Sequence, residues 1–516
     1  MAPTKTTDLT LDGRSLTLDA LIPVIDGSPL TLGVSSAALD TVRVCREHVE
    51  KHLRNGDVVY GLTTGFGRLK NVAIAEADLE TLQSNLVLSH CCGIGEPMPV
   101  DEVRVAQVLR LNGLVRGHSG LRVSVVEKLV RLFNLGFVPV VPRQGSVGAS
   151  GDLAPLAHMA ASYMGHGEAF WNGTRMPAAD ALSQAGEEPL RLQAKEGLAL
   201  INGTEIMKAI GCVTWARTRN LSKAADAIAA LSLEALLGSV RPFDERLADL
   251  KGSEGHRRTA ANVRAALADS EILASHADCD RVQDPYSLRC VPQIHGAFKT
   301  AFAHVESVLA AEINAVTDNP LIFPDTDEIL SAGMFHGQPV SMILDYLGLA
   351  ICTLANVSER RIEQLVNPDL SRLPAFLSPE PGLNSGLMIA QVAAAALASE
   401  NKVHAHPASV DTVPTSANQE DHVSMGVTAA RKARTILQNT ESVLAIELLC
   451  AAQGRGFHKD LRAGKGAEAV QDALRQVVEP LTDDRYMATD IEAARELITS
   501  GRLVANVESA IGELHA

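Results

Sequence analysis

The sequence predicts a mainly α-helical protein, an elongated bundle of long helices with an N-terminal part that is rich in loops. Long proline-free stretches of good helix formers fill the C-terminal part of the 516 residues. Aromatic residues make up only 3% of the chain, and small side chains let helices pack closely. Glycine-rich turns gather instead in the N-terminal part, where they interrupt shorter elements.

The predicted long helices exceed the usual length of a globular helix, which suggests a bundle that continues across subunits. They cover residues 220–238, 340–366, 385–405 and 423–453.

The N-terminal part combines helices with short strand-like pieces at 57–62 and 137–141. Its glycine-rich turns are TGFG, GIGEP, GSVGASG and LINGT. Such loops on a helical scaffold are where a functional site is expected. We therefore divide the chain into a site-bearing part, 1–205, and a helix-bundle part, 206–516. Because no proline- or serine-rich linker separates them, we do not expect independent domains.

Composition and charge exclude several classes of partner. The net charge of -15 has no basic cluster, which argues against nucleic acid or an anionic membrane. Asp345 and Gln391 interrupt the most apolar windows before the roughly 20 residues of a membrane span. The start has no signal-peptide pattern. The eight cysteines form no CxxC pair and are expected to be reduced, so we expect a cytoplasmic protein.

The stretch GSVGASGDLAP, residues 145–155, admits several loop chemistries. Its glycines follow the spacing GxxGxxG, not the GxGxxG of a dinucleotide-binding turn, and no Gly-Lys-Ser/Thr makes it a phosphate-binding loop. A serine-nucleophile turn requires GxSxG, which is also absent. The plain alternative is a glycine-rich turn entering a helix, with Asp152 as its N-cap and Pro155 in its first turn.

Another chemistry accounts for the residues Ala149, Ser150 and Gly151. The backbone amide of Gly151 can attack the carbonyl carbon of Ala149, because a glycine without a side chain permits the close approach. Loss of two waters, one of them carrying the Ser150 hydroxyl, leaves an electrophilic 4-methylidene-imidazole-5-one (MIO) group. Gly148 keeps the approach uncrowded, and Asp152 is a candidate to assist the proton transfers.

The block GSVGASGDLAPLAHMA resembles the signature of the MIO-dependent aromatic amino acid ammonia-lyases and aminomutases. Further blocks resemble those of the family and stand in the family's order, within a resemblance that covers roughly residues 40–510. They are 60–67, 86–95, 195–205, 282–290, 335–340, 358–368 and 416–426. Within this family the resemblance is nearest to the histidine ammonia-lyases.

The resemblance implies non-oxidative deamination of L-histidine to trans-urocanate and ammonia, with MIO and no external cofactor. It also implies a homotetramer whose active sites combine loops of several subunits. A tyrosine or phenylalanine ammonia-lyase or 2,3-aminomutase is the alternative, and a non-catalytic paralogue is a third.

The resemblance implies that Tyr60 is the catalytic base that removes the β-proton. A tyrosine with an ordinary pKa of about 10 needs a hydrogen-bonded or electropositive setting for this work. The TTGFG segment that follows, residues 63–67, resembles a family loop that closes over the substrate. Without the resemblance, a packed tyrosine before a turn is an equal explanation.

Arg289 is the expected partner of the substrate carboxylate, because a guanidinium matches it with two hydrogen bonds. From the residues alone, a surface ion pair is the more ordinary role of such an arginine. Tyr286 and Gln283 are expected to support it. Asn202 is expected beside the MIO carbonyl, where developing negative charge needs hydrogen-bond donors.

The residues at the ring end of the substrate decide its identity. His90 and Glu420 match the histidine ammonia-lyase pattern, although tyrosine-specific relatives can also carry a histidine at position 90. The resemblance implies a catalytic role for Glu420, because a carboxylate can orient an imidazole or take part in proton transfer but would leave a phenyl ring facing a charge. Phe335 and Met388 are expected to line the apolar walls.

Two positions depart from the pattern. Met334 stands where the family usually has asparagine, and Glu205 stands where histidine ammonia-lyases usually have glutamine. His404 with His406, and His276 with Cys279, could each be half of a metal site. Neither pair has a third ligand at helical spacing, so we expect no metal site.

Overall fold

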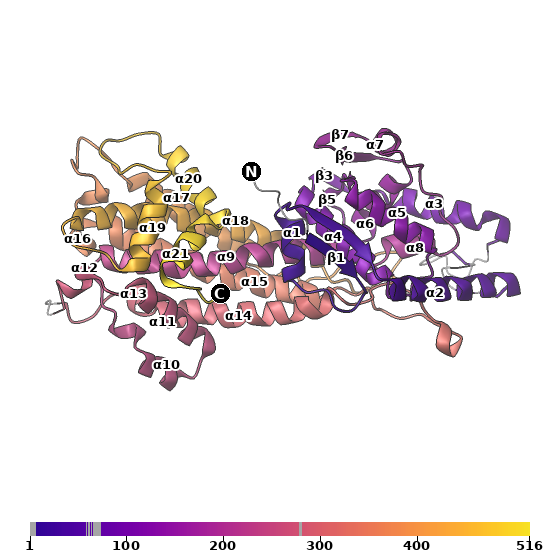
Figure 1. Cartoon of the computed structure of the whole chain (residues 1–516), viewed down its shortest axis with the longest axis horizontal. Helices are drawn as coiled ribbons and strands as arrows, with labels where there is room; N and C mark the ends of the chain where they lie inside the picture. The colour runs from indigo at the N-terminus through magenta and orange to yellow at the C-terminus, as the bar shows by residue number, and fades with distance from the viewer. Residues whose placement is uncertain (1–6, 58, 60–61, 63, 66–73, 278–280) are drawn as a thin grey trace. The chain divides into compact units, whose positions relative to one another are not determined.

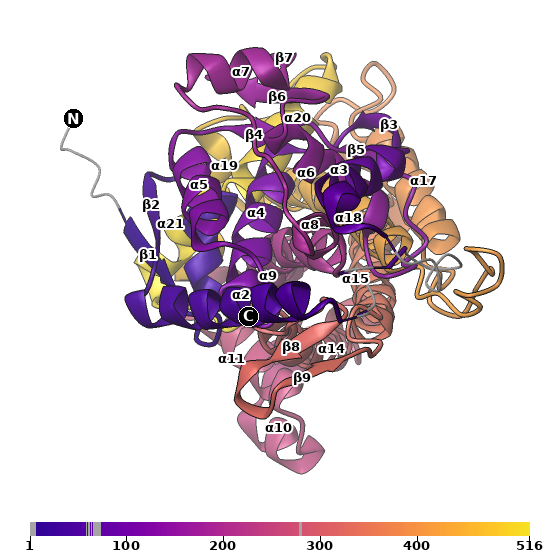
Figure 2. The same cartoon turned by 90° about the vertical axis from the view of Figure 1, so that its right-hand side faces the viewer.

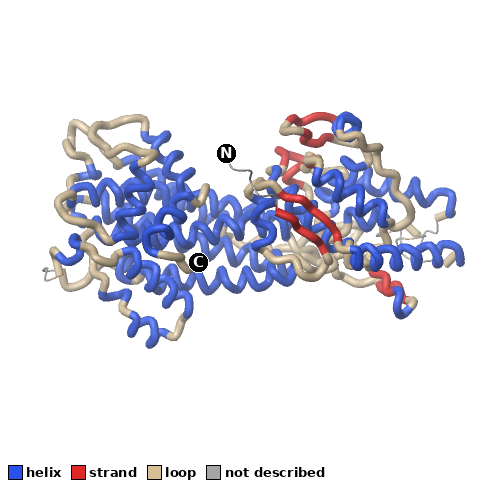
Figure 3. The backbone as a smooth tube through the Cα atoms, viewed as in Figure 1, coloured by secondary structure: helices blue, strands red, loops and turns tan. Residues whose placement is uncertain are grey.

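The computed structural model describes residues 7–516 except 58, 60, 61, 63, 66–73 and 278–280. The described residues are mainly helical, with short strands in two- and three-stranded sheets (Figure 3). The predicted mainly α class of a helical bundle is therefore confirmed.

Long helices dominate the described chain (Figure 1). Each of the four stretches that the sequence predicts as helical falls largely within one of them. The bounds of the five long helices named here are α9 Glu205–Ala235, α14 Val291–Glu312, α15 Gln338–Val366, α17 Met388–His404 and α18 Gly426–Arg455. Among the described residues, α15 alone is long and apolar enough to cross a membrane, and 72% of its most apolar window is buried.

The chain forms two compact units that interleave along the sequence. Unit 1 consists of residues 1–213, 306–344 and 407–431, and unit 2 of residues 214–305, 345–406 and 432–516. A compact unit of this kind is not the same as a domain, and the predicted division after residue 205 stays a prediction.

Unit 1 holds all of the described strands. The pairs are β1 Thr7–Leu11 with β2 Leu30–Val34, β3 Ile94–Pro97 with β5 Pro142–Gln144, and β8 Leu321–Phe323 with β9 Glu328–Leu330. A three-stranded sheet combines β4 Val138–Pro139, β6 Glu168–Trp171 and β7 Thr174–Pro177.

The strand expected at 137–141 is largely wrong, and the one expected at 57–62 lies partly outside the described residues. Only the two residues of β4 form a strand in the first piece, although the amide of Val140 still donates to the carbonyl of Glu168 at 3.0 Å. The described residues of the second piece form no strand.

The helices of unit 1 surround α4, which is buried on nearly every face (Figure 2). Three of them, α3, α6 and α8, pack against one another and carry the ends from which the site is built. The bounds are α1 Ile22–Ile25, α2 Ser36–Asn55, α3 Leu79–His90, α4 Val100–Leu114, α5 Val123–Asn134, α6 Leu153–Tyr163, α7 Ala178–Gln184 and α8 Glu196–Ile201.

Unit 2 encloses a fully buried ionic network. Arg361 donates two hydrogen bonds to the carboxylate of Glu447, and Asp226 accepts from His295 and pairs with Lys299. The remaining helices of this unit are α10 Glu245–Lys251, α11 Glu254–Ala266, α12 Glu271–Ala274, α13 Tyr286–Arg289, α16 Pro368–Ser371, α19 Lys465–Arg475, α20 Met487–Thr499 and α21 Arg502–Ile511.

Candidate active site

The loop between β5 and α6 has a left-handed backbone at four positions. The φ angles are 126° at Gly145, 86° at Gly148, 46° at Ser150 and 81° at Gly151. Ser150 carries a side chain in this region, which costs conformational energy. The amide of Gly151 donates to the carbonyl of Gly148 at 3.3 Å. The Ala149-Ser150-Gly151 segment is therefore held in a tight bend.

Two glycines of this loop are required by close packing. A Cβ on Gly151 would overlap the carbonyl oxygen of Gly203, and one on Gly148 would overlap the hydroxyl of Ser424. The amide of Asp152 donates to the carbonyl of Gly203 at 2.7 Å, and the amide of Gly203 donates to the carbonyl of Ser150 at 3.3 Å. No side chain larger than hydrogen fits at either glycine, which is what a backbone cyclisation through Gly151 requires.

The side chain of Asp152 caps a different helix from the one expected. It occupies the N-cap position of α6 but makes no capping hydrogen bond there. Its Oδ2 instead accepts from the amides of Ile206 and Met207, each at 2.9 Å, at the start of α9. Burial raises the pKa of Asp152 to about 7, although these amide hydrogen bonds lower it. Pro155 lies in the first turn of α6 as predicted.

Glu420 reaches the same loop from a distant part of the sequence. Its Oε1 accepts from the hydroxyl of Ser150 at 3.3 Å, and its Oε2 accepts from the hydroxyl of Thr415 at 2.7 Å. Thr415 and Glu420 also exchange backbone hydrogen bonds, across a turn whose residues 416–418 are left-handed. This turn fixes the carboxylate, and no pattern in the sequence marks Thr415 as its partner.

His90 is the last residue of α3, and its tautomer is set by the helix. Its Nδ1 lies 2.7 Å from the carbonyl of Leu86. A carbonyl only accepts, so Nδ1 carries the hydrogen and Nε2 of the neutral ring presents a lone pair. His90 can therefore accept a hydrogen bond from a ring N–H.

His90, Ala149 and Glu420 line one cavity of about 260 Å³. A site of this kind combines an apolar lining with a few placed polar groups. It is lined by Ser89, His90, Cys92, Gly145, Ser146, Val147, Ala149, Leu153, Ala154, Thr415 and Glu420.

Asn202, directly after α8, is oriented differently from the expectation. Its Nδ2 donates to Oδ1 of Asp318 at 3.2 Å and to the carbonyl of Asn319 at 3.0 Å. Asp318 is held in turn by Lys195 at 2.7 Å in a fully buried ion pair. The side-chain nitrogen of Asn202 is thus occupied. Its buried Oδ1 has no hydrogen-bond partner among the described residues. The side chain of Asn202 therefore has a free acceptor, whereas a donor was expected.

The negative charge of Glu205 is balanced by neighbouring cations. Its carboxylate pairs with Arg110 at 2.8 Å and Lys208 at 3.5 Å, and it accepts from the hydroxyl of Thr317 at 2.9 Å. Burial raises the pKa of Glu205, but the two cations outweigh it and lower the pKa to about 2. The glutamate therefore adds no net negative charge to the site.

The block at 422–426 lies against the glycine loop, and the block at 334–341 is bonded to it in turn. The imidazole of His336 reaches the carbonyl of His422 at 3.2 Å, and the hydroxyl of Ser341 donates to the carbonyl of Ser424 at 2.6 Å. The amide of Met425 donates to the carbonyl of Val147 at 2.9 Å. Within 334–341, Met334 is exposed and Phe335 is half-buried.

Four further predicted site residues belong to unit 2, whereas the glycine loop belongs to unit 1. The guanidinium of Arg289 lies 4.6 Å above the ring of Tyr286, on the short helix α13. Gln283 is exposed and precedes this helix, and Met388 begins α17 and is half-buried. Tyr60 lies outside the described residues.

The sequence profile of the aromatic amino acid lyases matches residues 16–476. The chain belongs to the aromatic amino acid lyase family. The resemblance noted in the sequence is thereby confirmed, and with it the expectation of a lyase.

Relatives cover nearly the whole chain. The histidine ammonia-lyase of Symbiobacterium thermophilum is 53% identical over 92% of this chain and 93% of its own length. That of Myxococcus xanthus is 49% identical, over 97% and 98% respectively. Among solved structures, the histidine ammonia-lyase of Trypanosoma cruzi is 41% identical with a TM-score of 0.91, covering 98% of this chain and 96% of its own. The tyrosine aminomutase of Streptomyces globisporus is 35% identical with a TM-score of 0.93, covering 99% and 100%.

Proposed function

We propose that the chain is a histidine ammonia-lyase, which removes ammonia from L-histidine without oxidation and releases trans-urocanate. The observation that carries the proposal is the shared cavity of His90, Glu420 and Ala149. The histidine ammonia-lyases at about half identity over nearly their full length support it. The protein is proposed to be cytoplasmic and to act as a homotetramer with active sites composed of several subunits.

The catalytic electrophile is proposed to be MIO, made from Ala149, Ser150 and Gly151. When formed, this group supplies an electrophilic methylene that activates the substrate for loss of its amine. The tight bend and the two closely packed glycines support the cyclisation. Asp152 is the proposed proton carrier for this step, since its pKa of about 7 lets it take up and release a proton near neutrality.

Glu420 is proposed to bind the imidazole ring of the substrate. In the uncyclised chain its Oε1 accepts from Ser150, and cyclisation removes that hydroxyl as water. Maturation would thus free this oxygen for a ring N–H at the moment the electrophile is made. A phenyl ring has no N–H or O–H for this carboxylate, so the desolvation of the carboxylate would go uncompensated. Nε2 of His90 accepts from the same end of the substrate.

The other end of the substrate is proposed to meet Arg289, with Tyr286 and Gln283 in support, while Tyr60 removes the β-proton. The buried Oδ1 of Asn202 is suited to accept from the substrate ammonium group, since its own Nδ2 is engaged. Phe335 and Met388 are proposed as apolar walls.

A tyrosine or phenylalanine ammonia-lyase or 2,3-aminomutase is the second candidate. Met334 bears on this choice, because the asparagine usual in the family is missing there; its loss affects the rate or the substrate preference and also supports a non-catalytic paralogue. The fold shared with the tyrosine aminomutase of Streptomyces globisporus is compatible with it. A non-catalytic paralogue would keep Ala149, Ser150 and Gly151 uncyclised.

The deciding experiment incubates the purified protein separately with L-histidine, L-tyrosine and L-phenylalanine. We expect urocanate absorbance with histidine, and an intact mass lower by two waters than the sequence mass. Coumarate, cinnamate or a β-amino acid without urocanate would replace the lead with the second candidate. An unchanged mass with no product would establish the paralogue.

A further inference from the structure

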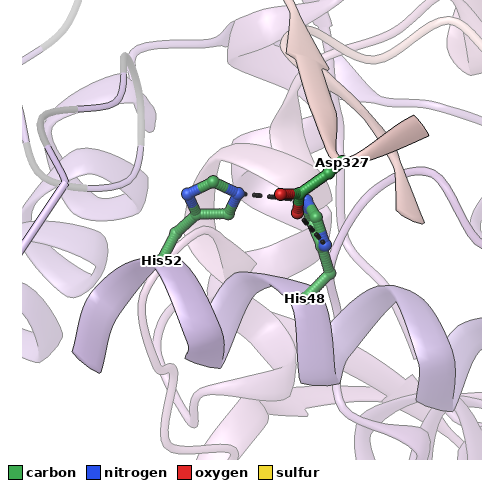
Figure 4. Close-up of side chains that lie close together, drawn as sticks. All are labelled: His48, His52 and Asp327. Carbon is green, nitrogen blue, oxygen red and sulfur yellow. Dashed lines mark hydrogen bonds and ion pairs between the residues drawn. The ribbon is translucent and has the colours of Figure 1, made fainter. Parts of the chain in front are cut away.

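Two histidines and an aspartate meet on the surface of unit 1, on elements other than the glycine loop (Figure 4). His48 and His52 lie one turn apart on α2, and Asp327 faces them from the turn between β8 and β9. One ligand atom from each residue lies within 4.8 Å of those of the other two. We propose that His48, His52 and Asp327 form a binding site for a divalent transition-metal ion such as Zn²⁺.

The core of unit 1 fixes this geometry. Ile322 of β8 packs in one buried cluster with Cys45 and Val49 of α2. The hairpin is thereby seated on the helix face that carries His48 and His52. Asp327 then has a left-handed backbone, with φ of 57°, at the end of the hairpin turn. Aspartate tolerates this conformation better than most residues.

The orientation of His52 is that of a metal ligand. Its Nδ1 lies 2.7 Å from the carboxylate of Asp57, and a carboxylate only accepts. The hydrogen therefore sits on Nδ1, and Nε2 presents its lone pair toward His48. A carboxylate that orients a histidine in this way is the usual outer partner of a zinc-bound imidazole.

Without a metal ion, the protons around the two rings cannot satisfy every contact, although Lys51 donates to Oδ1 of Asp327. The two Nε2 atoms are 3.0 Å apart, so neutral His48 must donate from its own Nε2 to His52. This leaves the lone pair of Nδ1 of His48 facing Oδ1 of Asp327 at 3.5 Å. A second proton on His48 would relieve the repulsion, but this ring is buried, where a charge is costly. A cation shared by the three residues relieves it directly.

The chemistry of the donors selects the metal. Two imidazole nitrogens and one carboxylate oxygen suit Zn²⁺, Ni²⁺, Co²⁺ and Cu²⁺, whereas Mg²⁺ and Ca²⁺ prefer oxygen alone. Three protein ligands leave at least one position for water. Lys51 competes for the site, since its ammonium lies 2.7 Å from Oδ1 of Asp327. Its side chain is half exposed and can turn into water when a metal binds.

The test measures Zn²⁺ and Co²⁺ binding by the full-length chain after removal of any affinity tag and treatment with a chelator. We expect one ion per chain at this site, a visible Co²⁺ spectrum typical of nitrogen and oxygen ligands, and a higher melting temperature with Zn²⁺. His52→Gln and Asp327→Asn should each weaken binding by at least about tenfold, and Asp57→Asn by about tenfold. These readouts do not depend on lyase activity, so they stand or fall separately from the proposed function.

His404→Gln is the matched control. His404 also sits one helical turn from a possible ligand, at 3.5 Å from Glu400, so this variant should bind as the wild type does. Should His52→Gln fail to fold, as judged by circular dichroism, Asp327→Asn decides, because its side chain is 58% exposed. The proposal is overturned if the wild type takes up no Zn²⁺ at micromolar concentration, or if folded Asp327→Asn binds as tightly as the control.

Discussion

The carboxylate of Glu420 accepts a hydrogen bond from the hydroxyl of Ser150 at 3.3 Å, across 270 positions of sequence. Ser150 is the residue whose hydroxyl must leave if MIO forms. The group proposed to choose the substrate ring is therefore in contact with the precursor of the proposed electrophile. In the proposed function, substrate recognition and maturation are therefore linked through one carboxylate oxygen.

Glu420→Gln should lower kcat/KM for L-histidine by about 10²-fold, the scale of a misplaced reacting group. An amide keeps the size of the side chain but loses the charge that orients an imidazole. Selectivity for histidine over phenylalanine, measured as the ratio of the two kcat/KM values, should fall as well.

Thr415→Val is the control for that variant. It removes one hydrogen bond to Glu420, worth about 1 kcal/mol, and keeps the charge. Its loss of activity should be about fivefold, with selectivity unchanged. Equal selectivity in Glu420→Gln and the wild type would contradict the role of the carboxylate.

Ser150→Ala should lower lyase activity by about 10³-fold or more, as removal of a group that acts covalently does. The methyl side chain cannot leave as water, so the mass should equal that of the sequence. The far-ultraviolet circular dichroism should match the wild type, because Ser150 lies before α6. Full activity in this variant would refute the proposed electrophile.

The long helices could be predicted because their signal is local. The proline-free stretch 340–366 corresponds to α15, Gln338–Val366, and composition alone marks it. The piece 137–141 has the apolar composition of a strand, but the length of the strand that forms depends on its pairing with β6. Pairing partners far along the chain are not visible in composition.

His90, Ala149 and Glu420, which the sequence proposes for the site, line one cavity, but the directions of the side chains could not be predicted from the sequence. Asp152 caps α9 through Ile206 and Met207, 54 and 55 positions away, and not the helix that follows it. The amide of Asn202 is turned by Asp318, 116 positions away. Both orientations come from buried polar partners that the packing brings together. The cluster at His48 was missed for the same reason, since Asp327 joins it only in the folded chain.

Glu205→Gln should destabilise the protein by about 3 to 5 kcal/mol at pH 7, because it leaves Arg110 and Lys208 as buried charges without their carboxylate. The pKa of Glu205 is lowered from 4.5 to about 2, so its contribution is present above pH 4.5 and is lost as the pH falls toward 2. Urea unfolding of the wild type and the variant should therefore converge in acid.

Thr317→Val provides the comparison, since it leaves both ion pairs of Glu205. It removes the hydroxyl that donates to Glu205 and accepts from the amide of Thr204 at 3.3 Å, and each of these two hydrogen bonds is worth about 1 kcal/mol. A cost for Glu205→Gln no larger than that of Thr317→Val would show that the buried cations are compensated by other groups.

Asp152→Asn should stabilise the protein at alkaline pH and impair its maturation. Burial raises the pKa of Asp152 from 3.8 to about 7, so between these values the folded chain holds a proton that the unfolded chain has released. The stability that this proton brings is complete below pH 3.8 and is lost as the pH rises through 7. The amide of asparagine stays neutral and still accepts from Ile206 and Met207. Urea unfolding at pH 8 should show a gain on the order of 4 kcal/mol, with almost none at pH 4. If Asp152 carries protons during cyclisation, intact mass spectrometry should find uncyclised chains in this variant, and complete loss of two waters would contradict that role.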